Sequence, residues 1–221
     1  PLRWRKPRRI FVCSMSDLFH ESVPDDFIGE VFGVMIQAKH HTFQVLTKRP
    51  ERMKAYLTGI GEELVHMVCG HIWIGVTVEN QARADERIPL LLQTPAAVRF
   101  VSCEPLLGPV DIFCKQTGDI LHYSGNEYDP GSINWVIVGG EAGPKARPCD
   151  VEWIRDIVEQ CKAAHDGVPC FVKQLGERPL TGLNEGEAGT VRVRLADKKG
   201  ANPSEWPEDI RVREFPKGAP R

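Results

Sequence analysis

The sequence predicts an α/β protein built as a full or partial (β/α) barrel. Short apolar runs bounded by turn residues alternate about six times with stretches of helical period, which is the pattern of a parallel sheet with crossover helices. The chain has 221 residues, a length that a single barrel domain reaches. A dinucleotide-binding fold is disfavoured, because the run Gly139-Gly140-Glu141-Ala142-Gly143 does not match GxGxxG.

The first strand and helix illustrate the pattern. Residues 10–14 (IFVCS) predict a buried strand, and residues 24 to about 40 predict an amphipathic helix. Pro24 suits the first helical turn, and Asp25-Asp26 suits the positive end of the helix dipole. The later elements alternate in the same way, with strands expected at 42–47, 71–78, 98–103, 134–139 and 170–173, and helices at 49–57, 80–93 and 150–164.

Two regions interrupt or follow this array. Residues 114–132 are polar and rich in glycine, and we interpret them as a loop insertion. From Glu177 onward, scattered glycines and prolines predict an irregular extension. We therefore expect a barrel domain over 1–176 and an irregular C-terminal extension over 177–221 that packs on or near it.

The composition narrows the class of protein. Hydrophobic residues make up 42% and charged residues 26%, as in ordinary globular domains, so a disordered or collagen-like chain is excluded. There is no apolar run of 18 residues that could span a membrane. The net charge of −2 gives no global basic field for nucleic acid. The seven cysteines contain no CxxC pair, which favours free thiols and a cytoplasmic location.

Polar residues follow every predicted strand, and this is where parallel α/β folds place their functional groups. Side-chain alternation puts Thr77 and Glu79 on the inner side of one strand, and Ser102 and Glu104 on the inner side of the next. Lys48, Lys173 and Glu141 should converge on the same end. The candidate catalytic residues are Lys48, Glu104 and Lys173. The candidate ligand-binding residues are Ser14, Asp17, Thr77, Glu79, Asn80, Ser102, Glu104, Gly139, Gly140 and Glu141.

These charged residues and the histidines also have other interpretations. The charges could be mutually satisfied salt bridges at a barrel mouth, and Asp17 could equally cap a local turn. His20 follows the first strand and is a catalytic candidate or a surface residue. A metal-dependent hydrolase using Glu79, Glu104 and a histidine is disfavoured, because no histidine closes a strand. His40-His41 is expected to cap a helix and not to bind metal.

The first nine residues carry Arg3, Arg5, Lys6, Arg8 and Arg9 around Trp4. Basic side chains interleaved with an aromatic ring can contact phosphates and stack a base. A solvated linker is the more frequent role of such a segment. Nucleic acid or a protein partner is therefore a candidate, and a membrane is not.

Several phrases resemble a known family: FVCSMSDLFHESVPDDFI, TFQVLTKRPERM, WIGVTVENQARADERIPLLLQTPA, RFVSCEPLLGPVDI, WVIVGGEAGPKARPCDVEWIRDIVEQC and PCFVKQLG. Together they resemble a phage- and bacterium-borne family of unknown function, described as a three-cysteine-motif, radical-SAM-like protein. The resemblance runs from about residue 1 to residue 176. It implies a barrel of radical-SAM type that uses a [4Fe–4S] cluster and S-adenosylmethionine on an unidentified substrate.

The chain departs from that family in one respect. The family's three cysteines near the N-terminus, two of them in CxxC spacing, have no counterpart here, although thiolates are the standard cluster ligands. Because the chain begins at Pro1 within a family-like phrase, we expect the cysteines on an upstream segment and this form to be cluster-free. The alternative is a barrel that has lost the chemistry and binds a ligand or partner. Gly139-Gly140-Glu141 has the letters of the family's GGE-like turn but lies on a late strand, so that role is not transferred.

Overall fold

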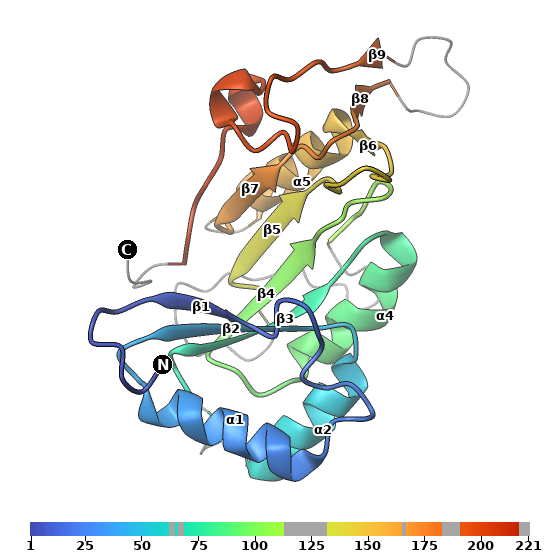
Figure 1. Ribbon diagram of the computed structural model, residues 1–221. Coiled ribbons are helices and arrows are strands. Elements are labelled where there is room, and N and C mark those ends of the chain that lie inside the picture. Colours follow the sequence, from blue (N-terminus) through green and yellow to red (C-terminus); the bar gives the residue numbers. More distant parts are fainter. Residues whose placement is uncertain (62–64, 66–68, 113–131, 165–166, 183–190, 217–221) are drawn as a thin grey trace.

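Six parallel strands form the central sheet of the computed structural model, which describes residues 1–61, 65, 69–112, 132–164, 167–182 and 191–216 (Figure 1). They are β1 (Arg9–Val12), β2 (Thr42–Thr47), β3 (Ile72–Thr77), β4 (Val98–Cys103), β5 (Trp135–Gly139) and β7 (Cys170–Gln174). The strand order is β1-β2-β3-β4-β5-β7. Within the described residues β1 and β7 do not pair with each other, so the sheet is a curled half-barrel. The partial barrel is confirmed, and the full barrel is not.

Four helices of the described chain cover one side of this sheet: α1 (Asp25–Gln37), α2 (Pro50–Ile60), α4 (Gln81–Leu92) and α5 (Val151–Ala163). Local sequence explains where they begin. Pro50 occupies the first turn of α2, where its missing N–H is not needed. The Asn80 and Asp150 side chains accept hydrogen bonds from the amides of Arg83 and Glu152 and so cap α4 and α5. The predicted helices are confirmed with shifted ends, the second running on to Ile60.

Alternating side chains give the sheet two different faces. On the helix side, Val45, Ile74, Val76, Val101 and Val138 belong to the large core that also contains the apolar stripes of the helices. On the inner side, a second cluster consists of Trp73, Phe100, Trp135 and Ile137, with Phe171 and Phe215 packed against it. Aromatic rings therefore fill most of the inner face before the strand ends, and Gln44 of β2 lies beside Trp73 in register.

The C-terminal extension is more structured than the sequence predicts. It contains β8 (Pro179–Thr181) and β9 (Val191–Arg192), which form a small sheet with β6 (Cys149–Asp150). Two short 3-10 helices follow at Pro203–Glu205 and Glu208–Ile210. Trp206 and Ile210 are buried. Most other described residues of the extension lie outside regular elements, and its short strands pair with partners that lie farther away along the sequence.

The last described segment runs antiparallel to β7. The amide of Val172 donates to the carbonyl of Val212 at 2.9 Å, and the amide of Glu214 donates to the carbonyl of Cys170 at 2.8 Å. This segment therefore covers the outer edge of β7. The predicted loop insertion at 114–132 lies, up to residue 131, outside the described residues. Among the described residues, no helix has both the length and the apolar character that crossing a bilayer requires.

Candidate functional site

Lys48 and Glu79, which follow β2 and β3, form the first ion pair of the candidate site. Lys48 Nζ donates to Glu79 Oε1 at 2.5 Å, and Arg87 Nη1 of α4 donates to Glu79 Oε2 at 3.1 Å. The Glu79 side chain is 13% exposed and that of Lys48 is 52% exposed. Burial raises the pKa of Glu79, but the hydrogen bond and charge of Lys48 and the charge of Arg87 outweigh it and hold that pKa below its usual value.

Arg87 of α4 is the buried cation that pairs with Glu79. Its side chain is 7% exposed, and its Nη1 also donates to the carbonyl of Thr77 at 2.8 Å. Sequence reasoning missed this residue. The available signal was its position on the buried face of α4, in phase with Ala84, Ile88 and Leu91, since an arginine on an apolar stripe needs a buried partner.

A second ion pair closes the other side of the site. Lys173 Nζ on β7 donates to Glu104 Oε2 at 2.9 Å, with side-chain exposures of 54% and 17%. Gly139 of β5 lies beside this carboxylate: a Cβ there would lie 3.4 Å from Glu104 Oε1 and 3.0 Å from the carbonyl oxygen of Gln174. The Gln174 carbonyl is the tighter neighbour, and the contact with Glu104 is an ordinary van der Waals distance.

Two hydroxyls lie between these pairs. Thr77 and Ser102 are register partners in β3 and β4, and both are buried. They precede Glu79 and Glu104 by two residues, so all four side chains stand on the inner face. The strand-end site is defined here as Lys48, Glu79, Thr77, Ser102, Glu104 and Lys173. The structure thus brings together all three candidate catalytic residues, of which Glu104 is also a ligand-binding candidate, with three further ligand-binding candidates.

Asp17 lies next to this site and binds backbone and side-chain donors. Its Oδ1 accepts from the Thr47 hydroxyl at 2.7 Å and the Phe19 amide at 3.0 Å, and its Oδ2 accepts from the Lys48 amide at 2.9 Å and Arg49 at 3.1 Å. Burial raises its pKa, but these hydrogen bonds outweigh that effect and keep the pKa below its usual value. Asp17 therefore fixes the backbone that carries Lys48, in addition to capping its own turn.

The remaining ligand-binding candidates have other contacts. Asn80 caps α4. Gly140 is buried, and a Cβ there would lie 2.2 Å from the carbonyl oxygen of Leu175, so close packing requires it. Glu141 forms a two-pronged pair with Arg147 at 2.8 Å, which lowers its pKa to about 2. Ser14 lies in an exposed turn after β1. Within the described residues, none of the four forms a hydrogen bond or ion pair with the strand-end site.

The histidines of the described ranges do not contribute to the strand-end site. The ring of His20 contacts the hydroxyl of Ser22 at 2.8 Å. His40 Nε2 contacts the carbonyl of Trp4 at 2.6 Å, and His41 contacts the Pro1 carbonyl and the Arg8 amide. The expected helix-capping role of His40-His41 was wrong, because α1 ends earlier, at Gln37. These rings instead hold the N-terminal segment against the sheet.

The described residues contain no group of three or more His, Cys, Asp or Glu that could hold a metal ion. Five of the six described cysteines are buried, and burial raises the pKa of Cys149 to about 12 and also raises that of Cys103. Thiols of this kind are poor ligands because the thiolate is the ligating form. The described residues therefore do not fit a [4Fe–4S] cluster.

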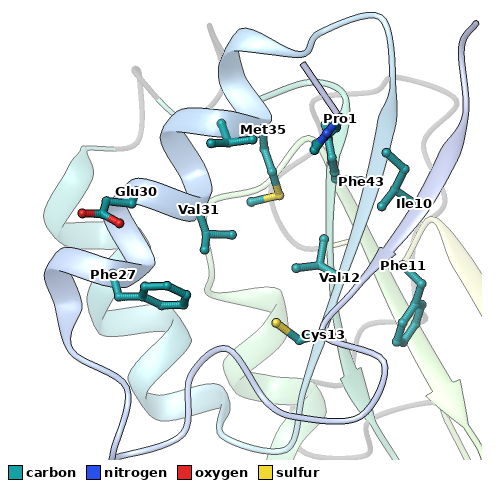
Figure 2. Close-up of a pocket in the computed structure, with 11 residues that line it drawn as sticks. Pro1, Ile10, Phe11, Val12, Cys13, Phe27, Glu30, Val31, Met35 and Phe43 are labelled. Carbon is teal, nitrogen blue, oxygen red and sulfur yellow. The ribbon is translucent and has the colours of Figure 1, made fainter. Parts of the chain in front are cut away.

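A separate, apolar groove lies between β1 and α1 (Figure 2). Its volume is about 440 Å³. The sulfur atoms of Cys13 and Met35 lie toward it, and the carboxylate of Glu30 points away (Figure 2). Cys13 has a φ of 56°, which lies in the left-handed region that residues other than glycine rarely adopt. This groove holds no charged pair and is separate from the strand-end site.

A family model described as "Protein of unknown function (DUF5131)" matches residues 1–208. No curated protein and no solved structure matches the chain.

Proposed function

Because the chain belongs to the family described as Protein of unknown function (DUF5131), we propose its function from the site itself: a radical-SAM-like half-barrel whose strand-end site binds S-adenosylmethionine. The observation that carries the proposal is the pair of Lys–Glu bridges on either side of two buried hydroxyls.

The donor chemistry of the site fits the methionyl end of this ligand. That end carries both an ammonium and a carboxylate, so it needs anionic and cationic partners together. Glu79 and Glu104 are mostly buried, whereas Lys48 and Lys173 are half exposed. Ion pairs with such an exposed partner contribute only about 0–1 kcal/mol. A ligand carboxylate can therefore take over either lysine at small cost, while the glutamates remain to accept an ammonium.

The buried hydroxyls add neutral hydrogen-bonding groups between the charges. Thr77 and Ser102 can each donate and accept, which suits the polar atoms of a ribose or of the amino-acid moiety. If bound there, S-adenosylmethionine would supply a sulfonium, and its radical cleavage would need one electron from a donor that the described residues do not hold. Glu104, Lys173 and Lys48 are the proposed catalytic residues, because they are the charged groups that a substrate entering at the strand ends would meet.

The iron–sulfur cluster has no place among the described residues, and no reaction step is derived through it. The proposal for this chain is therefore restricted to ligand binding by its own side chains. It does not require that the 221 residues perform the radical reaction alone.

Calorimetric titration with S-adenosylmethionine tests the proposal. We expect saturable binding by the unmodified chain, and about 10- to 100-fold weaker binding by Glu104→Gln and Lys173→Met, since a charge-assisted hydrogen bond contributes about 1.5–3 kcal/mol. Arg147→Met is the matched control, because Arg147 pairs with Glu141 outside the site. Absence of binding, or equal binding by all four proteins, would refute the proposal.

The second candidate function is a binding module without chemistry, acting on nucleic acid or a protein. The observation in its favour is that residues 1–9 are all exposed and that Arg3, Arg5 and Lys6 have no carboxylate partner among the described residues. Iron and sulfide analysis of the full-length gene product after anaerobic reconstitution separates the two candidates. About four irons per chain support the enzyme, and a folded, iron-free product supports the binding module.

A further inference from the structure

A second polar cavity opens directly after the end of β7. It has a volume of about 640 Å³, and its lining includes Gly176, Glu177, Arg192, Arg194, Asp197 and Lys198. The small sheet of β6, β8 and β9 provides part of its wall and lies beyond the upper ends of β5 and β7 (Figure 1). We call this cavity the cationic groove.

The two carboxylates of the groove are already used by the backbone. Glu177 Oε2 accepts the Gly143 amide at 2.8 Å. Asp197 accepts the amides of Lys199 and Ala201 through its two oxygens. Both acids therefore hold loops in place, and neither forms an ion pair with a cation of the groove in the described part of the chain.

Among the described residues, the three cations of the groove have no carboxylate partner. Arg192 Nη2 donates to the backbone carbonyl of Glu177 at 3.3 Å. Within the described ranges, Arg194 and Lys198 are exposed and have no carboxylate partner. The lining holds three cations, Arg192, Arg194 and Lys198, against the two carboxylates of Glu177 and Asp197, so positive charge is in excess there. Their arrangement thus favours an anionic ligand.

We propose that the cationic groove binds a phosphate group of the substrate, either of a nucleotide or of a nucleic-acid backbone. Guanidinium groups match phosphate oxygens in a two-pronged geometry, and an ammonium adds a point charge. The volume exceeds that of a single phosphate and lies in the range of small-molecule pockets. A bare inorganic anion is therefore smaller than the groove.

The position of the groove relates it to the strand-end site. Gly176 lies three residues after Lys173, and the amide of Glu177 donates to the carbonyl of Glu141 at 2.9 Å. Both sites therefore lie at the carboxyl ends of the same parallel strands. The strand-end site takes a zwitterion and the groove takes a phosphate, so the inference concerns the substrate and stands independently of S-adenosylmethionine binding.

Three phosphate probes test the inference: inorganic phosphate, a mononucleotide, and a fluorescent single-stranded oligonucleotide. We expect the Arg194→Gln/Lys198→Gln variant to bind the mononucleotide or the oligonucleotide at least 10-fold more weakly than the unmodified chain. The Lys54→Gln/Lys162→Gln variant loses the same charge on α2 and α5 and should bind normally. Binding of the mononucleotide indicates a nucleotide substrate, and binding of the oligonucleotide alone indicates a nucleic-acid backbone.

Two results would overturn the inference. One is that neither nucleotide probe binds the unmodified chain; the other is that the groove variant and its charge-matched control bind equally. S-adenosylmethionine is titrated into the same groove variant as a separate readout. If the variant binds S-adenosylmethionine normally but loses phosphate binding, the two sites act independently. A failure of one proposal then leaves the other standing.

Discussion

Asp17 is the residue on which the local geometry of the strand-end site most depends. Its carboxylate accepts four hydrogen bonds, including the amide of Lys48. We predict that Asp17→Asn lowers the free energy of unfolding by about 2–4 kcal/mol, because two of these donors lose an acceptor and hydrogen bonds to a charged group are the stronger ones. Urea unfolding measures this. Asp26→Asn, at an exposed site on α1, should change stability little.

Asp17 and Glu79 should also make the protein acid-sensitive. Their pKa values in the folded state are lowered, so their contribution to stability is present above the unfolded-state values near 4 and is lost as pH falls through the folded values. We predict a falling unfolding free energy below about pH 4.5, with a slope of up to about 1.4 kcal/mol per pH unit for each group. Asp17→Asn and Glu79→Gln should each flatten the curve, whereas an unchanged slope in both variants would contradict this account.

Much of the strand-end site could be predicted from individual residues and their spacing. Period-two alternation correctly placed Glu79 and Glu104 on one face, and the two bridges to Lys48 and Lys173 follow from it. Glu141 was assigned by the same rule, yet its partner Arg147 is only six residues away. A local partner of this kind competes with convergence on a shared site, and alternation alone does not detect it.

Glycine positions show how the elements constrain one another. A Cβ at Gly75 of β3 would lie 2.6 Å from the Phe100 ring on β4, whereas Gly33 of α1 has nothing within 4 Å. We predict that Gly75→Ala destabilises the protein by about 1–3 kcal/mol through overpacking. Gly33→Ala should stabilise it by about 0.5–1 kcal/mol, because alanine has the higher helix propensity. Thermal unfolding of the two variants checks the opposite signs.

The segment that runs beside β7 is an element that the periodicity of the sequence does not predict. Phe215 packs on Trp135 and Phe171 with ring centroids 5.3 and 5.0 Å apart, and Arg9 lies 3.7 Å from its ring centroid. We predict that Phe215→Ala costs about 1–3 kcal/mol, as expected for removal of a half-buried aromatic ring. Phe27→Ala, at a ring that is 50% exposed, is the control and should cost less. Equal losses would mean that Phe215 does not close the inner face.

The whole molecule explains why the degree of barrel closure was left open by the sequence. Strand and helix alternation predicts each βα unit locally, whereas closure depends on whether the two outer strands meet. In the described residues they do not, and Phe215 with its neighbours fills the space beside the inner aromatic cluster. Contacts across about 80 positions, such as the Trp135 indole with the Glu214 carbonyl, leave no periodic signal.

The fold as a whole separates three regions of different chemistry. Aromatic rings fill the lower inner face, charged pairs occupy the strand ends, and the cationic groove extends from the end of β7. A ligand bound at the strand ends therefore rests above a closed apolar floor.

The most direct test of the strand-end site is a nuclear magnetic resonance titration of the isotopically labelled chain with S-adenosylmethionine. The account predicts that saturable chemical-shift changes are concentrated at the amides of Lys48, Glu79, Glu104 and Lys173, and that Glu104→Gln reduces them. Shifts confined to the apolar groove between β1 and α1, or no saturable shifts in a folded protein, would contradict it.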